Sequence, residues 1–352
     1  MHGRDAHGKG VQQGEETGAG TLPAMEWVRH GECPVCRSKR FAPFDSIEFR
    51  GHTIRYQRCK ACSLVFMNPM PTQDWYNAFY ASEFWEDKSV KQAGSKGAHN
   101  VKQWKKELNW ADKFVDLISR WDLAPGGNPS ILEIGCAFGL IVEALADRFH
   151  GKALGVEPSD SASAFASAYA GVEVVAKNMD ELSSRSGTRA DLVLCSHVIE
   201  NIVDVNKSFR TIREVLRPGG GFVLDTPNVF FQKSVSIFHP YCFCRRSIET
   251  VFRRHGFDIL GISASGRARG VFCPMYVTVL ARKPEGGEVP AEVSAAGDPI
   301  FPLKLAAGRA LRRLTLLKYV KALDRRLLRT IHPPSSYNRE RLARLEAQVT
   351  ES

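Results

Sequence analysis

The chain has 352 residues, of which 43% are hydrophobic and 24% are charged, a composition typical of a globular protein with more than one core. No apolar run reaches the roughly 18 residues of a membrane span, which excludes an integral membrane protein, and residues 1–25 lack an apolar signal segment. We therefore expect a cytoplasmic protein whose nine cysteines are metal ligands or small core residues rather than a disulfide framework.

Residues 1–25 are predicted to form a disordered tail, because Gly, Gln, Glu and His dominate them without helical or strand periodicity. Two Cys-x-x-Cys pairs follow, 22 residues apart: Cys33, Cys36, Cys59 and Cys62. Each pair offers two thiolates from one tight turn, and structural zinc is commonly bound by four thiolates. The pattern predicts a zinc ribbon over residues 26–70, with residues 41–56 as its hairpin. Redox-active dithiols, the alternative, lack the expected strand–helix setting.

Residues 71–125 are predicted to form a helical lid or linker. Trp75, Phe79 and Tyr80 have helical spacing, and they form either a face packed on the domain that follows or a lid over its pocket. Residues 89–100 are predicted to be a flexible link, and residues 104–118 an amphipathic helix that leads into the next domain.

A strand, a bend and a helix are predicted from residue 130 onward. The apolar residues before Gly135 favour a buried strand, and the small residues Gly135, Ala137 and Gly139 favour a bend before a helix. Such a bend leaves backbone N–H groups open to a polar ligand group. Glu157 follows the next strand, at the position from which a carboxylate binds ribose hydroxyls. The pattern therefore predicts a nucleoside site.

The bend differs from a dinucleotide fingerprint, because its third small residue comes one position too early. The spacing Glu133-x-Gly135-x-Ala137-x-Gly139 instead resembles the first motif of the class I S-adenosylmethionine-dependent methyltransferases. The resemblance continues through a strand ending at Cys195-Ser196-His197, a helix, Pro218-Gly219-Gly220-Gly221, and a strand ending at Thr226-Pro227-Asn228. It implies an α/β, Rossmann-like domain over residues 126–283 with a seven-stranded sheet, whose last two strands are residues 257–262 and 275–280.

With the ribbon and the aromatic segment, the chain resembles a subgroup that includes sugar C-methyltransferases and enzymes of surface-polysaccharide and secondary-metabolite pathways. Ala137 replaces the middle glycine usual in the family. Asn178 would lie where the fold contacts adenine, but ordinary turn or N-cap chemistry explains it equally well. The resemblance implies that S-adenosylmethionine contacts Glu133, Gly135, Ala137, Gly139, Glu157, Asn178, Met179 and Ser196.

The candidate catalytic residues are His197, Glu200, His239 and Tyr241. His197 directly follows the fourth strand, and an imidazole titrates near neutrality. Glu200 lies on the same loop, and we expect His239 and Tyr241 to close the pocket from the opposite side. A hydrogen-bonded structural histidine is the alternative for His197. The family often has a second histidine where this chain has Asn201.

Residues 284–300 are predicted to be a linker, and residues 301–352 a basic helical extension with twelve Lys or Arg and four Asp or Glu. The extension therefore carries eight of the ten net positive charges. Its apolar stripe changes direction, from Leu303, Ala307, Ala310, Leu314 and Leu317 to Leu323, Leu327 and Ile331, which predicts two shorter helices or one helix that wraps its partner. These helices either pack against the catalytic domain or a second subunit of a homodimer, or contact anionic lipid headgroups.

The sequence predicts methyl transfer from S-adenosylmethionine to a small-molecule acceptor, a sugar or glycan-linked hydroxyl or carbon. An RNA or DNA methyltransferase is the first alternative, suggested by the ribbon and the basic extension. It is disfavoured because Cys195-Ser196-His197 stands where base-amino methyltransferases have an Asn/Asp-Pro-Pro-aromatic loop. A non-catalytic protein that binds the cofactor or a partner is the second alternative.

Overall fold

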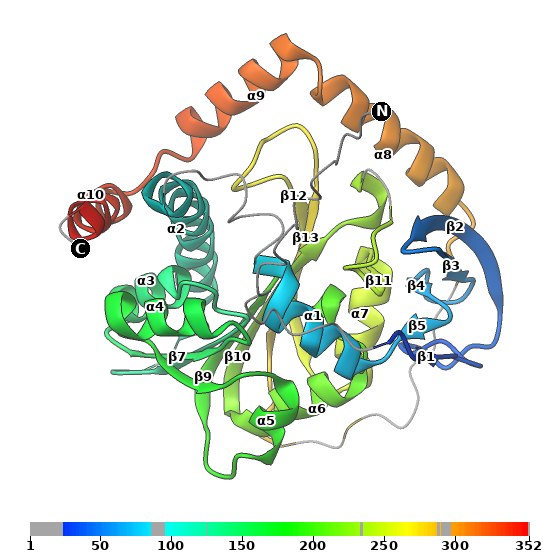
Figure 1. Ribbon diagram of the computed structural model, residues 1–352, viewed down its shortest axis with the longest axis horizontal. Coiled ribbons are helices and arrows are strands. Elements are labelled where there is room, and N and C mark those ends of the chain that lie inside the picture. The colour runs from blue at the N-terminus through cyan, green and yellow to red at the C-terminus, as the bar shows by residue number, and fades with distance from the viewer. Residues whose placement is uncertain are drawn as a thin grey trace, which may run out of the picture.

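A computed structural model describes residues 24–85, 96–124, 126–232, 235–286, 289 and 297–350. Most of the expected tail, part of the expected link at residues 89–100 and most of the linker at residues 284–300 lie outside the described residues. A central sheet lies between two groups of helices, with a small β domain on one side and a helical extension along the outer edge (Figure 1).

The central sheet has seven strands, as predicted, in the order β12-β13-β10-β9-β6-β7-β8. Neighbouring strands are parallel except where β13 pairs with β10 and β12. The last two strands are joined without a described helix and lie at one edge of the sheet. The bounds are β6 Ser130–Ile134, β7 Lys152–Val156, β8 Glu173–Ala176, β9 Ala190–Ser196, β10 Leu216–Pro227, β12 Asp258–Ser265 and β13 Tyr276–Arg282.

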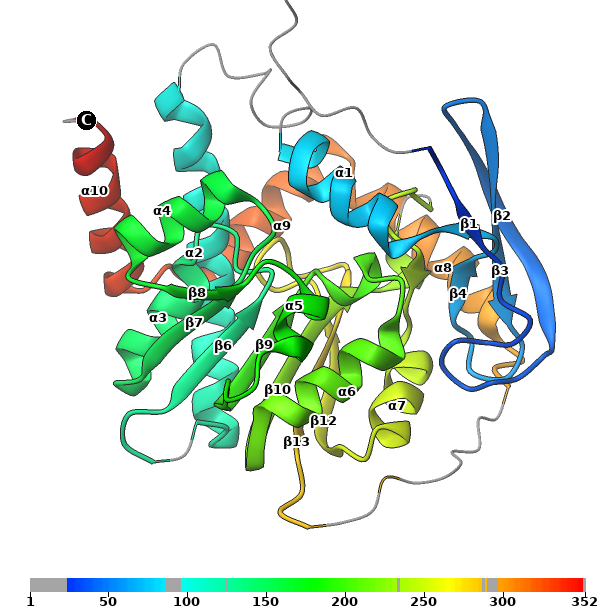
Figure 2. The same ribbon diagram turned by 60° about the horizontal axis from the view of Figure 1, so that its bottom comes forward.

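Alternate residues of the inner strands enter two separate cores, because successive side chains of a strand point to opposite faces. Leu132 and Val193 join a core with α5, α6 and α7, whereas Ile131 and Leu192 join a core with α2, α3, α4 and α10. Figure 2 shows these two helical layers on either side of the sheet. The bounds are α2 Lys96–Trp121, α3 Leu140–Phe149, α4 Asp160–Ala170, α5 Met179–Ser184, α6 Val205–Val215, α7 Arg245–Arg254 and α10 Ser336–Thr350.

The N-terminal ribbon is built into the catalytic domain by strand pairing. Its predicted hairpin is present as β2 and β3, and a four-stranded sheet runs in the order β11-β4-β3-β2. Strand β11 comes from the segment after β10, so one sheet joins the two parts of the chain. The bounds are β1 Trp27–Val28, β2 Phe41–Phe49, β3 His52–Cys59, β4 Val65–Met67, β5 Met70–Pro71 and β11 Tyr241–Cys242.

The aromatic segment forms helix α1 (Gln73–Trp85), and two of its predicted face residues, Trp75 and Phe79, are buried. Short 3-10 turns follow β9 and β10, at Ile199–Asn201 and Val229–Phe231. The Gly-rich segment after α6 is part of strand β10 rather than a loop before it, because β10 already begins at Leu216.

The predicted pair of C-terminal helices is present as α8 (Phe301–Thr315) and α9 (Lys318–Ile331). Helix α10 lies within the predicted helical extension, although the apolar stripe did not single it out, and it packs on α2 through Leu345, a member of the α2–α3 core. Among the described helices, none has both the length and the apolar character required to cross a membrane.

Candidate functional site

The bend between β6 and α3 has a backbone that requires small residues. Gly135 and Gly139 have φ values of 71° and 77°, and Ala137 has a φ of 49°. A Cβ on Gly139 would lie 2.7 Å from Cγ2 of Val172, and a Cβ on Gly135 would overlap Val198. The small residues are therefore required by both conformation and space.

Glu157, at the end of β7, points into this bend. Its Oε2 accepts a hydrogen bond from the backbone N–H of Ala137 at 2.9 Å, and its Oε1 accepts one from Ser159, also at 2.9 Å. The residue is 3% exposed, and burial raises the pKa of its carboxyl to about 7. Each carboxylate oxygen has two lone pairs, so each retains acceptor capacity for a ligand hydroxyl.

Two further carboxyl groups are buried near the bend. Oε2 of Glu133 accepts a hydrogen bond from the Val142 N–H at 3.1 Å, and burial, reinforced by Glu107, raises its pKa. Glu107 comes from α2, and burial raises its pKa to about 8. Sequence reasoning missed Glu107, although an acidic residue beside buried Leu108 on an amphipathic helix was the available signal.

These carboxyl groups fit S-adenosylmethionine chemically. Oε2 of Glu107 is buried without a hydrogen-bond partner, and Glu107, Glu133 and Glu157 act on one another electrostatically. A buried acidic cluster is stabilised by a cation, and S-adenosylmethionine carries positive charge at its sulfonium and ammonium groups. Its ribose hydroxyls suit the free lone pairs of Glu157.

The remaining predicted cofactor residues lie beyond β8 and β9. The Asn178 side chain accepts a hydrogen bond from the Glu181 N–H at 2.9 Å, so its oxygen caps helix α5. Met179 is 8% exposed in the first turn of that helix, and Ser196 is the half-buried last residue of β9. The N-cap alternative for Asn178 is thus present, and no described contact assigns these three residues to a ligand.

His197 lies between two buried carboxyl groups. Its Nδ1 is 3.5 Å from Oε1 of Glu200, and its Nε2 is 3.7 Å from Oδ2 of Asp225. Both separations are longer than ordinary hydrogen bonds. The φ of His197 is 58°, an uncommon backbone conformation for a non-glycine residue. The backbone oxygen of His197 accepts a hydrogen bond from Nδ2 of Asn201 at 3.1 Å, so the residue that replaces the family's second histidine supports this loop.

The ring of His197 is held by aromatic contacts. It meets Trp110 and Tyr276 edge-on, with centroid distances of 4.8 and 5.0 Å. Burial lowers the pKa of His197 to about 3, against the opposing effect of Asp225. The imidazole is therefore neutral at neutral pH.

A buried ion pair holds Asp225, the carboxylate that faces Nε2 of His197. Nζ of Lys113 on α2 is 2.6 Å from Oδ1 of Asp225 on β10, and Thr278 donates a further hydrogen bond to that oxygen. Both charged side chains are at most 2% exposed. Sequence reasoning missed this pair because its members are 112 positions apart. An acidic residue within the apolar run of β10 was its only local signal.

Glu200 is buried beside His197. Oγ1 of Thr226 donates a hydrogen bond to its Oε2 at 3.0 Å, and burial raises the pKa of the carboxyl, against the opposing effect of His239. The structure therefore brings His197, Glu200 and His239 to one region, as predicted.

The prediction that Tyr241 closes the pocket is wrong. Tyr241 is 0% exposed, and its hydroxyl donates a hydrogen bond to the Val203 backbone oxygen at 2.5 Å. Burial also raises its pKa. Its position in β11, paired with Phe66 of the ribbon, gives the ring a structural place in the core.

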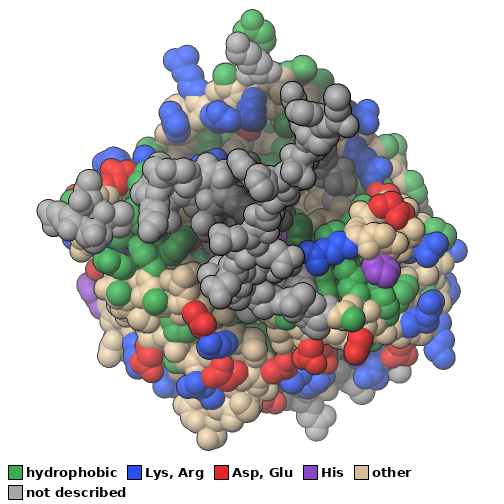
Figure 3. All heavy atoms as spheres, viewed as in Figure 1, with side chains coloured by type: hydrophobic (Ala, Val, Ile, Leu, Met, Phe, Trp, Pro, Cys, Tyr) green, Lys and Arg blue, Asp and Glu red, His purple; other side chains and the backbone are tan. Residues whose placement is uncertain are grey.

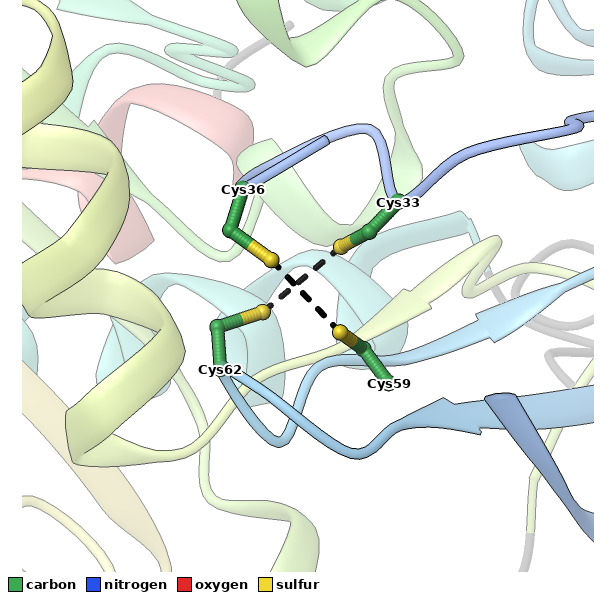
Figure 4. A group of neighbouring side chains, drawn as sticks. All are labelled: Cys33, Cys36, Cys59 and Cys62. Atoms are coloured by element: carbon green, nitrogen blue, oxygen red, sulfur yellow. Dashed lines mark hydrogen bonds between the residues drawn. The ribbon is translucent and has the colours of Figure 1, made fainter. Parts of the chain in front are cut away.

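The four ribbon cysteines converge on one point (Figure 4). Their sulfurs all lie within 4.8 Å of one another, and the Cys33–Cys62 and Cys36–Cys59 pairs are 3.6 and 3.5 Å apart. A tetrahedron with zinc–sulfur bonds of about 2.3 Å has sulfur–sulfur edges of about 3.8 Å. The donor set therefore fits a four-thiolate zinc site without a free coordination position.

Comparison with known proteins identifies the same region. Residues 104–262 match a family model described as a methyltransferase domain. A ubiquinone biosynthesis O-methyltransferase from Bradyrhizobium diazoefficiens is 33% identical over 107 residues, which cover 29% of this chain and 41% of the relative. The human mitochondrial ubiquinone biosynthesis O-methyltransferase is 26% identical over 106 residues, or 28% of each chain. The chain thus spans about two fifths or less of these relatives' length.

Solved structures are similar to about half of the chain. An S-adenosylmethionine-dependent methyltransferase from Mesorhizobium loti is 19% identical, with a TM-score of 0.39, and covers 49% of this chain and 100% of that one. The glycopeptide N-methyltransferase MtfA in complex with S-adenosylmethionine is 16% identical, with a TM-score of 0.39, and covers 49% of this chain and 94% of that one. The [4+2]-cyclase SpnF is 18% identical, with a TM-score of 0.41, and covers 50% of this chain and 81% of that one.

Proposed function

We propose that the chain, through a class I S-adenosylmethionine-dependent methyltransferase domain, transfers a methyl group to a hydroxyl of a small, sugar-like acceptor. The observation that carries this proposal is the position of Glu157, whose carboxylate lies against the N–H of Ala137 in the bend after β6.

In this proposal the bend and the acidic cluster hold the cofactor. Glu157 accepts hydrogen bonds from the ribose hydroxyls, while Glu107 and Glu133 favour the positively charged end by electrostatic attraction. When bound, S-adenosylmethionine supplies a methyl group that its sulfonium already activates. The protein's remaining tasks are to position the acceptor, exclude water and remove a proton.

His197 and Glu200 are the proposed proton acceptors. The neutral imidazole is held in place by Trp110 and Tyr276, so it loses little freedom when it accepts a proton. Asp225 is 3.7 Å away and stabilises the imidazolium that results. Glu200, whose pKa burial raises, takes or shares the proton on the other side of the ring.

The acceptor class rests on two supports. The relatives are named O-methyltransferases, which favours a hydroxyl over a carbon or nitrogen. The ribbon and the aromatic segment together resemble enzymes that modify sugars. Within the ribbon, zinc would be bound by Cys33, Cys36, Cys59 and Cys62 and would have a structural role, because all four coordination positions are filled by sulfur.

The experiment is a comparison of His197→Ala with the intact protein. We expect turnover to fall by at least about a hundredfold with little change in cofactor affinity, because a general base acts on the chemical step. Between pH 5.5 and 8 the intact enzyme's rate should show no loss from protonation of His197, since its folded pKa of about 3 lies below that range. A nearly intact rate in the variant would remove His197 from the mechanism.

Acceptor identity is tested by mass spectrometry of sugars and glycans from cells with and without the protein. The expected result is a species that is lighter by one methylene in cells that lack the protein. Transfer to nucleic acid instead, with no change in the glycans, would overturn the acceptor class.

A further inference from the structure

Helix α8 is fixed to the rest of the protein by only one of its sides. Its inward side contains Phe301, whose ring lies 4.9 Å from that of Phe230, and Gly308, where a Cβ would overlap the Phe230 backbone oxygen. Arg312 adds a hydrogen bond of 2.7 Å to the backbone oxygen of Phe231. The helix therefore has a defined inner side and a defined outer side.

The outer side of α8 and α9 is apolar. Leu303, Leu314 and Leu317 share one face of α8 and its end, and they are 68%, 56% and 56% exposed. The stripe continues onto α9 with Tyr319 and Leu323, which are 86% and 52% exposed. These side chains were expected to cover the catalytic domain or a second subunit, or to meet lipid. In the described chain they face away from the catalytic domain, which leaves a second subunit or lipid as the alternatives.

Helix α9 is attached through a different side. Oδ1 of Asp324 accepts hydrogen bonds from the backbone N–H groups of Val271 and Phe272 at 2.6 and 3.0 Å. Asp324 is the only acidic residue among residues 301–331, and it is buried at this contact. Acidic residues from other segments reach the flanks of α8, where Lys304 lies 2.9 Å from Asp298 and Arg309 lies 3.8 Å from Asp45.

The stripe is flanked by positive charge. Residues 301–331 contain nine Lys or Arg against one Asp, a net charge of +8. Figure 3 shows Lys and Arg side chains along the outer rim that α8 and α9 form. On α8, Lys304 lies on one side of the stripe, and Arg309 and Arg313 lie on the other, by helical spacing.

We propose that the outer face of α8 and α9 binds an anionic lipid membrane surface. An apolar helical stripe bordered by Lys and Arg is the pattern of a helix that lies in the plane of a membrane interface. The leucines and Tyr319 enter the boundary between headgroups and acyl chains, while the basic side chains contact anionic headgroups. A second copy of the same face is disfavoured, because pairing would bring two surfaces of net charge +8 together.

The test is flotation of the full, zinc-loaded chain with phosphatidylcholine vesicles, with and without phosphatidylglycerol. We expect binding to the anionic vesicles at least about tenfold tighter than to the neutral ones, and weakened by salt. Equal binding to both kinds of vesicle, or no binding to either, would overturn the proposal.

Two variants separate the apolar contribution from a general loss of fold. The triple variant Leu303→Gln, Leu314→Gln and Leu317→Gln should lose at least about tenfold in vesicle affinity while its circular dichroism is unchanged. The control replaces Trp121 and Tyr169, which are 43% and 38% exposed on α2 and α4, by Gln and should bind as the parent does. Unchanged binding by the triple variant, or a vesicle-independent dimer that the triple variant abolishes, would contradict the proposal.

Discussion

The ribbon and the C-terminal extension both flank the domain that holds the central sheet, but they are attached in opposite ways. In the ribbon, Phe66 and Tyr56 are at most 1% exposed, and β4 pairs with β11 of the catalytic domain. In the extension, Leu303 and Tyr319 are 68% and 86% exposed. The ribbon therefore belongs to the catalytic domain's core, whereas the extension leaves one apolar face exposed.

The ribbon and α1 also contact residues 236–240, the segment that contains His239. The Tyr56 hydroxyl donates hydrogen bonds to the backbone oxygens of Ser236 and His239 at 2.6 and 3.1 Å, and Tyr76 donates to Ile237 at 2.6 Å. The N–H of Met67 donates to the Pro240 oxygen at 2.8 Å. Residues 236–240, which carry His239 toward Glu200, are thus positioned by the ribbon and α1. The extension makes no such contact with this segment among the described residues.

The largest expected effect comes from breaking the metal site. Cys62→Ser should abolish stoichiometric zinc and lower the free energy of unfolding by at least about 3 kcal/mol. Turnover should fall with the ribbon, because residues 236–240 lose their support. Cofactor affinity should change little, because the bend lies on the other part of the domain. Metal analysis, thermal unfolding and titration calorimetry measure these three quantities.

The matched control is Cys273→Ser, which changes a buried cysteine outside the ribbon. If Cys62→Ser kept its zinc, its stability and its turnover, the ribbon would not be a four-thiolate zinc site that supports the catalytic loop.

The second effect tests the bend itself. Gly135→Ala should cost about 2–5 kcal/mol, because it adds left-handed strain to a clash with Val198. Gly171→Ala is the control, since its φ is 63° but nothing lies within 4 Å of the added Cβ, so only about 1–2 kcal/mol is expected. Equal costs in chemical denaturation would show that space at the bend is unimportant.

The smallest effect is a change in the pH dependence of the unfolding free energy when Glu107 is replaced. Burial raises the pKa of Glu107 from 4.5 to about 8, so its contribution to stability is fully present below pH 4.5 and is lost as pH rises toward 8. Glu107→Gln should therefore flatten the decline in unfolding free energy between pH 5 and pH 8. At pH 8 the variant should be more stable than the parent. If the unfolding free energy declined equally in both proteins, a group other than Glu107 would be responsible for the pH dependence.

Sequence patterns predicted the sheet and the cluster of four cysteines because both depend on local spacing. Gly135 and Glu157 follow consecutive parallel strands, and such strand ends meet at one edge of a sheet. The Lys113–Asp225 pair and the inward position of Tyr241 depend on packing between distant elements, which local spacing does not encode. The sequence likewise did not determine what the apolar face of α8 contacts. A stripe such as that from Leu303 to Leu317 does not specify what covers it.

The most direct test of the central claim is titration of S-adenosylmethionine into the zinc-loaded chain and into Glu157→Gln. The account predicts one binding site in the parent and at least about tenfold weaker binding in the variant, since a neutral amide is a poorer acceptor for two ribose hydroxyls. The exposed Glu173→Gln on β8 should bind as the parent does. Absence of binding by the folded parent, or equal affinity in Glu157→Gln, would contradict it.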